Sequence, residues 1–454
     1  MAKETCDVSG STSKTCPMPE TRWIVVISAF IAGFVTCGIS YSTSIYYVEW
    51  IESFGESYSL TSIVASLNIG LSALLGPLAG VLVSYLGYSW VFIIAGLVSF
   101  TGMLSAVFAN NIYVLMVTFG IITGFGYGIA FSPLIVMAPT FFPEKQSLAQ
   151  GFAISGIGLG TIVMPLIIES TIVSYGWRGS VLILAGISLN LTVCGVMIRL
   201  VPKLKHHEQP KTKKNVLKLS MLKFVPFILL LINGVLFSMA MSVMFVHLTA
   251  LVQYQTNVSK LDASRFLMGY GIANFTGRII QGVIAHMKRV HIFSQMLLSY
   301  MIMAICVILM TLTKEFWIML IFGCVTSFMS VPYGVLWPAI TSEIVGYERL
   351  EIGFCYTNFA CGIGLIVGAP IAGWIYSTSG DYRLSLYFTA VSIVCSVIVL
   401  LPPWWTSLNE HRRREVVSEL KEEAPDAVYP TSSGQLETLV TKPLISQQNE
   451  TVNH

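Results

Sequence analysis

The sequence predicts an all-α membrane protein in which twelve transmembrane helices form two six-helix bundles. Of its 454 residues, 54% are hydrophobic and only 11% are charged, which is too little charge for the wet surface of a soluble chain of this length. Apolar runs of about twenty residues or more, each long enough to cross the hydrocarbon core of a bilayer, recur along the chain. One long basic segment divides these runs into two groups of six.

The predicted spans are separated by short polar or turn-rich breaks. The first 22 residues are polar, and the apolar run that follows them is too long for the core of a cleavable signal peptide. We therefore expect the first span to stay in the membrane. The twelve predicted spans are residues 23–47, 60–84, 88–109, 112–138, 148–174, 179–200, 224–253, 264–286, 291–313, 316–341, 352–377 and 384–403.

Five parts of the chain follow from these limits. They are a cytoplasmic tail at 1–22, a first six-helix bundle at 23–200, a basic cytoplasmic loop at 201–223, a second six-helix bundle at 224–404, and a largely disordered cytoplasmic tail at 405–454.

Charge in the loops predicts the orientation in the membrane. The loop 201–223 is rich in lysine, and positive loops stay in the cytoplasm. The loop after the first span carries Glu49, Glu52 and Glu56 without Lys or Arg, which favours the outside. An even number of spans then places both termini in the cytoplasm. The lysines of the basic loop are expected to contact anionic lipid or to act as a retention signal, with no role in transport.

The composition and residue spacing argue against several functions. The net charge of +3 gives no indication of nucleic acid as a partner. His, Cys, Asp and Glu do not cluster with metal-ligand spacing, and no nucleophile lies beside a base, so neither a metal, nor a cofactor, nor an enzyme is predicted. The run Gly156-x-Gly158 lies inside an apolar span without a preceding strand, so it is not read as a nucleotide fingerprint.

A repeat of glycine, tyrosine and proline indicates a transporter. The fourth span contains Gly-Tyr-Gly at 126–128 followed by Pro133, and the tenth contains Pro-Tyr-Gly at 332–334 followed by Pro338. Secondary transporters bind their substrate near the middle of the membrane, between two related halves whose helices are interrupted by Gly and Pro. Tight static packing of the helices is the alternative explanation of these glycines.

Arg278 stands out among the charges inside the predicted spans. It lies about 12 Å along its helix from His286 at the cytoplasmic end, too deep for easy snorkelling. A guanidinium there is a strong receptor for a carboxylate, and the alternative is an arginine paired with backbone carbonyls or a structural acid. Asn274, one turn earlier on the same face, can bind substrate or orient Arg278. Glu169 and His247 are expected to serve packing.

Several short runs carry a family resemblance by their order and spacing. They are 76–83, 141–151, 175–179, 343–346, 368–373 and 380–382. With these runs the chain resembles the monocarboxylate transporters (solute carrier family 16) of the major facilitator superfamily across nearly its whole membrane region. The resemblance implies the major facilitator fold, a carrier activity and the plasma membrane. Because some family members need a single-span immunoglobulin-like chaperone, it also implies such a partner beside the lipid bilayer.

The chain also departs from the family at residues that matter for coupling. Of the family's usual first-span opening only Glu20-Thr-Arg-Trp23 remains. Proton-coupled lactate carriers have a lysine that falls near Tyr41 and an aspartate at the position of Asn274, whereas Arg278 matches. Because that lysine and aspartate tie proton movement to substrate movement in such carriers, proton coupling by this mechanism is not expected.

The sequence therefore predicts a secondary transporter that works by alternating access and is not a standard proton symporter. Its expected substrate is a small carboxylate-bearing solute, either a monocarboxylate or a zwitterion such as an amino-acid-, creatine- or carnitine-like compound. Two alternatives stay open: a neutral-solute facilitator in which Arg278 is structural, and a non-transporting membrane receptor or assembly protein. The residues expected to bind substrate are Arg278, Asn274, Tyr41, Tyr333 and Trp337.

Overall fold

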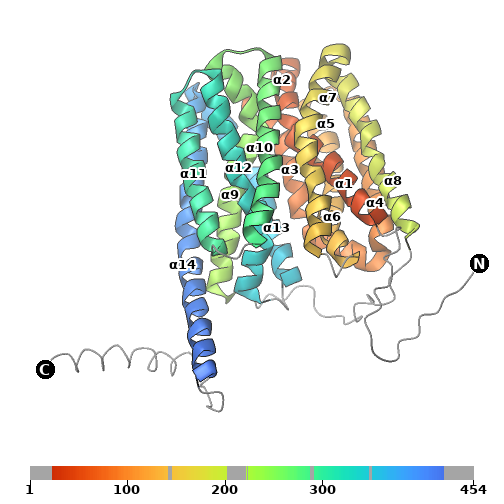
Figure 1. Cartoon of the computed structure of the whole chain (residues 1–454). Coiled ribbons are helices and arrows are strands. Elements are labelled where there is room, and N and C mark those ends of the chain that lie inside the picture. Colours follow the sequence, from red (N-terminus) through yellow and green to blue (C-terminus); the bar gives the residue numbers. More distant parts are fainter. Residues whose placement is uncertain are drawn as a thin grey trace, which may run out of the picture. The chain divides into compact units, whose positions relative to one another are not determined.

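The computed structural model of the chain describes residues 23–141, 146–201, 221, 223–286, 291–346 and 350–423. This part of the chain consists of helices joined by short turns (Figure 1). The chain divides into a compact unit, Met1–Leu401, and a second unit, Pro402–His454. The predicted tail 1–22, nearly all of the basic loop 201–223 and residues 424–454 lie outside the described residues.

Nine helical elements cover the six spans predicted for the first half of the chain. Two glycines with positive φ break long helices, Gly87 (φ 79°) in α4 and Gly176 (φ 70°) in α7. Glycine adopts this backbone conformation without steric cost. Both breaks fall between spans that the sequence predicted. The elements are α1 (Trp23–Tyr41), α2 (Thr43–Phe54), α3 (Tyr58–Leu74), α4 (Gly76–Ala106), α5 (Ile112–Leu115), the π-helix η2 (Met116–Thr123), α6 (Gly124–Phe141), α7 (Gln146–Ser188) and α8 (Asn190–Arg199).

The second half has one helix for each predicted span. These helices are α9 (Val225–Thr256), α10 (Lys260–His286), α11 (Ile292–Leu312), α12 (Phe316–Val345), α13 (Leu350–Ser379) and α14 (Tyr382–Glu423). The last of them continues as helix through residues 405–423, the first part of the predicted tail. This stretch is rich in Glu and Arg, which favour helix even where the chain is too polar to enter a membrane.

Nine helical segments of the described residues are long and apolar enough to cross a membrane. The longest, Gly151–Arg199, contains two predicted spans separated by Gly176. The helix α3 is shorter and joins the first part of α4 to complete the second span. The remaining span, α10, falls outside the nine because polar residues, Arg278 and Asn274 among them, lower its hydropathy. The prediction of an all-α membrane protein is confirmed.

The most extensive contacts between the two halves are those of α3 with α13, α7 with α10, and α2 with α9. Glycines allow the backbones to come close at these contacts. A Cβ atom on Gly362 of α13 would lie 2.5 Å from the backbone nitrogen of Leu74 on α3. A Cβ atom on Gly271 of α10 would lie 2.4 Å from the carbonyl oxygen of Thr161 on α7. The pathway predicted between the halves is therefore bordered by tightly packed helices.

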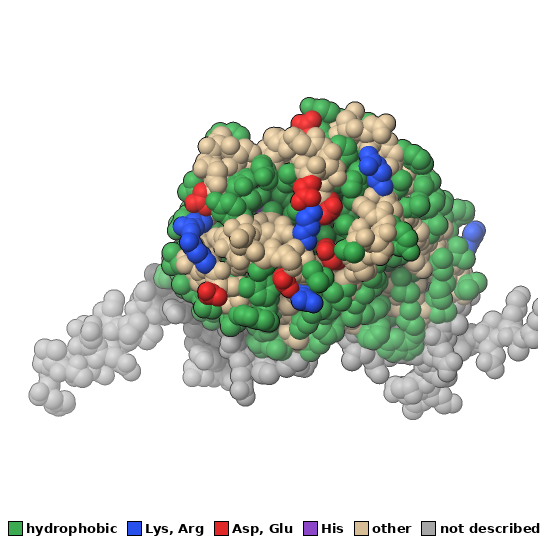
Figure 2. Space-filling view, turned by 90° about the horizontal axis from the view of Figure 1, so that it is seen from above, with side chains coloured by type: hydrophobic (Ala, Val, Ile, Leu, Met, Phe, Trp, Pro, Cys, Tyr) green, Lys and Arg blue, Asp and Glu red, His purple; other side chains and the backbone are tan. Residues whose placement is uncertain are grey.

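The end of the bundle at which α2 ends and α3 begins is called the α2–α3 end. The short turns between antiparallel helices place the end of α9 and the start of α10 at the same end. Figure 2 looks onto it and shows charged side chains of both signs near its middle, with hydrophobic side chains around the rim. A hydrophobic rim around a polar end is what a helical bundle in a bilayer requires.

Candidate functional site

Arg278 lies on α10 with its neighbour of the preceding turn as a hydrogen-bond partner. Its Nε donates a hydrogen bond to Oδ1 of Asn274 at 3.0 Å. The four-residue spacing places both side chains on one face of the helix, and both are half-buried. The neutral amide thus holds one edge of the guanidinium, and among the described residues neither Nη group has a hydrogen-bond partner.

Two further helices approach the guanidinium. On α12, Gly334 has no side chain, and outside its own helix the described atom nearest to a Cβ built there is Nη1 of Arg278, at 4.0 Å. On α1, Tyr41 and Cys37 lie within electrostatic reach of the same guanidinium. Helices from both halves of the chain therefore meet around Arg278, and Gly334 leaves space beside its terminal nitrogens.

No acid neutralises Arg278 within the described residues. Three ion pairs between a carboxylate and a lysine or arginine are found there, and a fourth joins His291 to Glu343 at 3.6 Å. None of the four includes Arg278. A cation in this position, half-buried and without a counter-charge, is costly inside a membrane and favours binding of an anion.

Tyr41 links the two halves beside this cation. Its ring stacks on the ring of Phe245 from α9, with centroids 4.2 Å apart and planes inclined by 6°. Such offset stacking stabilises aromatic pairs beyond the area that they bury. Phe245 could not be identified from the sequence, because one more phenylalanine in an apolar span carries no distinguishing signal.

Tyr333 and Trp337 belong to an aromatic cluster that begins next to Gly334. The half-buried ring of Tyr333 lies 4.3 Å from that of Phe237 and 4.6 Å from that of Trp337. Trp337 is only 3% exposed, and its indole nitrogen has no hydrogen-bond partner in the described part of the chain. The structure thus brings Arg278, Asn274 and Tyr41 together, whereas Tyr333 and Trp337 pack among themselves in the second half. Their binding role stays a prediction.

Comparison with known protein families identifies the superfamily of this chain. The family model described as "Major Facilitator Superfamily" matches residues 29–346. The chain belongs to the major facilitator superfamily. Its curated relatives include human "Monocarboxylate transporter 14", 26% identical, with 87% of this chain and 92% of that protein covered. Mouse "Monocarboxylate transporter 12" is 26% identical, with 83% and 84% covered, and rat "Monocarboxylate transporter 13" is 25% identical, with 90% and 95% covered.

These matches confirm the predicted resemblance to monocarboxylate transporters. This superfamily member is therefore a membrane transporter and not an enzyme.

In the transporter His247 is fully buried. Its Nε2 atom lies 2.9 Å from the carbonyl oxygen of Ala369, and its ring meets that of Tyr47 in a T-shaped arrangement with centroids 4.7 Å apart. Across the residues that the structure describes, no group of three His, Cys, Asp or Glu is arranged to hold a metal.

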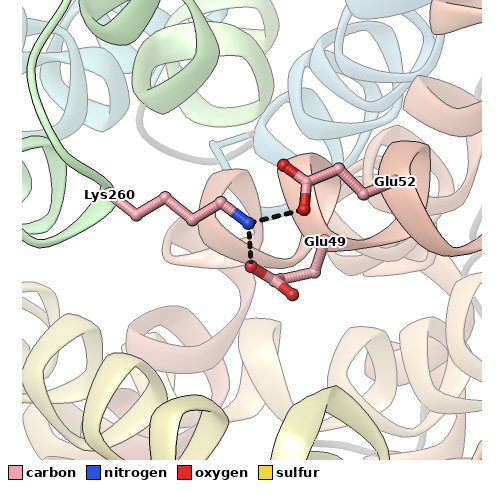
Figure 3. Close-up of polar contacts among 3 residues, drawn as sticks. All are labelled: Glu49, Glu52 and Lys260. Atoms are coloured by element: carbon pink, nitrogen blue, oxygen red, sulfur yellow. Dashed lines mark hydrogen bonds and ion pairs between the residues drawn. The ribbon is translucent and has the colours of Figure 1, made fainter.

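The transporter contains one charged cluster whose role the sequence did not indicate (Figure 3). Glu49 and Glu52 lie on α2, not in an open loop, and Lys260 is the first residue of α10. The Nζ atom of Lys260 lies 2.7 Å from Oε1 of Glu49 and 2.7 Å from Oε2 of Glu52. Burial lowers the pKa of Lys260, but the hydrogen bonds and charges of the two carboxylates outweigh it, so this pKa is raised.

Proposed function

We propose that this transporter moves a small carboxylate-bearing solute, a monocarboxylate or a zwitterion, by alternating access. The observation that supports this substrate class is the half-buried guanidinium of Arg278, which has an amide partner and no acidic partner among the described residues. A carboxylate can accept two parallel hydrogen bonds from the Nη groups of an arginine. Binding of substrate would thus supply the missing counter-charge.

The neighbours of Arg278 support a site between the halves. Gly334 leaves room beside the guanidinium, and Tyr41 of the first half of the chain lies within electrostatic reach of it. A site formed by both halves is exposed to one side and then to the other when the halves rock against each other. The relatives' names refer to monocarboxylates, which is consistent with this substrate class.

We further propose that the transporter does not couple substrate to protons in the way implied for lactate carriers. The positions of their aspartate and lysine hold Asn274 and Tyr41, and neither side chain exchanges a proton near neutral pH. Substrate uptake should therefore change little when a proton gradient is imposed across the membrane of proteoliposomes. Strong stimulation by external acid would contradict this proposal.

The orientation and the setting of the transporter follow from the loop charges and the family. We propose that both termini are cytoplasmic, that the α2–α3 end faces outward, and that the protein resides in the plasma membrane. A single-span immunoglobulin-like chaperone remains a proposed partner. Antibody labelling of tags at the termini in intact and permeabilised cells tests the orientation, because a tag detected in intact cells contradicts it.

The substrate class is tested by uptake into proteoliposomes with labelled carboxylates and their amide analogues. Loss of a charge-assisted hydrogen-bonded pair costs roughly 1.5–3 kcal/mol, so Arg278→Ala should lower uptake of the acid about 10- to 140-fold. Arg265→Ala is the matched control, because Arg265 lies on the same helix and pairs locally with Asp262 at 2.9 Å. It should leave uptake unchanged.

Each alternative has its own outcome in this assay. Unchanged uptake in the Arg278→Ala transporter excludes the assigned role of the guanidinium. Equal transport of acid and amide by the unmodified transporter supports a neutral-solute facilitator. If no tested compound is transported by correctly inserted protein, a receptor or assembly function is supported.

A further inference from the structure

The contact between Lys260 and its two glutamates crosses from one half of the transporter to the other. Glu49 and Glu52 belong to α2 in the first half, and Lys260 begins α10 in the second half. The three side chains meet at the α2–α3 end, where one ammonium lies between two carboxylates (Figure 3). Glu49 is the most shielded of the three, with a side chain 19% exposed.

Further bonds join the halves at this end and, about 15 Å further along α2, inside the bundle. Thr249 of α9 donates a hydrogen bond to Ser44 of α2, with 2.9 Å between the hydroxyl oxygens. Ser59 of α3 donates to the carbonyl oxygen of Pro370 on α13 at 3.0 Å. The rings of Tyr58 and Tyr376 meet edge-on, with centroids 4.5 Å apart. Together these contacts hold the halves against each other, so the structure is closed at the α2–α3 end.

We propose that Lys260, Glu49 and Glu52 form an ionic gate that stabilises the closed state of this end and breaks in every transport cycle. Alternating access requires the halves to separate at each end in turn. On separation, Lys260 moves with α10, while both glutamates stay on α2. These three residues therefore act in the conformational change and not in recognition of the solute.

Lys260 supplies the positive charge on which closure of the gate depends. Glu169 of α7, also in the first half, lies within electrostatic reach of both Glu49 and Lys260. Removing Lys260 leaves these carboxylates together without a positive charge, and their mutual repulsion then opposes closure. The gate is nevertheless partly solvated, with the Lys260 side chain 41% exposed and that of Glu52 58% exposed. It is therefore weak enough to break repeatedly.

A disulfide between α2 and α9, in the part of the bundle that leads to the α2–α3 end, measures closure without any substrate. Cysteines introduced together as Ser44→Cys and Thr249→Cys replace hydroxyls 2.9 Å apart, so they should oxidise to a disulfide in the closed state. In this background Lys260→Gln should slow cross-linking about three- to tenfold. The charge swap Lys260→Glu with Glu49→Lys and Glu52→Lys should restore the rate, because it re-forms the attraction with reversed signs.

Matched controls separate gating from general damage. Arg265→Gln breaks an ion pair confined to α10 at the same end and should leave the cross-linking rate unchanged. Each single cysteine variant shows whether native cysteines contribute. Cross-linking of the Lys260→Gln protein at the parental rate would overturn the proposal, and so would a folded charge-swap protein that stays slow. If Lys260→Gln does not reach the membrane, the charge swap still decides. Because no solute is used, the outcome is independent of the proposed substrate class.

Discussion

Replacing Gly271 by alanine tests how tightly the two halves pack. This glycine lies on α10 against α7, and an added Cβ atom would meet three backbone atoms: the carbonyl oxygen of Thr161 at 2.4 Å, its carbonyl carbon at 2.7 Å, and the nitrogen of Ile162 at 3.0 Å. Backbone atoms cannot move aside by changing rotamer. The two helices must therefore separate by about 1 Å to reach ordinary van der Waals contact.

The packing cost of Gly271→Ala can be measured against a control variant. Overpacking of this kind costs roughly 1–3 kcal/mol, which corresponds to an about 5- to 140-fold change in the population of the observed conformation. Gly151→Ala on α7 is the control, because its Cβ atom meets nothing within 4 Å. Alanine there should gain up to about 1 kcal/mol from its higher helix propensity. The difference between the two variants isolates the packing cost at Gly271.

Thermal unfolding of the purified transporter, followed by tryptophan fluorescence, and uptake into proteoliposomes provide the measurements. We expect a lower unfolding midpoint and slower uptake for Gly271→Ala, with neither change in Gly151→Ala. If Gly271→Ala unfolds at the same temperature and transports at the parental rate, α7 and α10 are not in close contact during the cycle and the packing argument is wrong.

Three further predictions concern buried bonds, pH and the space beside Arg278. Asn68 accepts a hydrogen bond from Ser40 at 2.7 Å and donates one to the carbonyl oxygen of Phe119 at 3.0 Å, so Asn68→Ala should cost roughly 1–3 kcal/mol, seen as a lower unfolding midpoint. Because the pKa of Lys260 is raised in the closed state, its ammonium should stay charged up to about pH 10.4, and on the alkaline side the gate should weaken only as the pH rises through the raised value. Distances between spin labels across the α2–α3 end should therefore be constant from about pH 7 to about pH 9. Gly334→Leu should abolish uptake without lowering the unfolding midpoint, because the new side chain fills space beside the guanidinium and not a packed contact.

The main elements of the fold could be predicted because the bilayer constrains them. Apolar runs of sufficient length mark the spans, and breaks such as Gly87 and Gly176 occur where the backbone turns with positive φ. The pairing of Asn274 with Arg278 follows from helical spacing alone, since residues four apart share a face. The helical continuation over 405–423 was missed because its polarity was taken as a sign of disorder, although its residues favour helix.

Contacts between distant segments could not be predicted in the same way. Lys260 and Glu49 are 211 residues apart, and only the packing of α2 beside α9 and α10 brings them together. The predicted topology did place both on the outer side, which was the one available signal. Phe245 faces Tyr41 because of the rotation of α9, which an almost uniformly apolar sequence does not reveal. The burial of Trp337 within the second half depends on the same kind of helix rotation, and its predicted role in binding stays a prediction.

The neutral amide beside Arg278 has a consequence for the electrical behaviour of the carrier. With no acidic partner for this arginine among the described residues, the empty site carries one positive charge, and a bound monoanion cancels it. Under the proposed function, the returning empty carrier then moves charge through the membrane, which is worth about 2.3 kcal/mol per 100 mV for each charge. A negative interior would therefore drive a monoanion outward and leave the distribution of a zwitterion unaffected, so the membrane voltage itself distinguishes the two kinds of substrate.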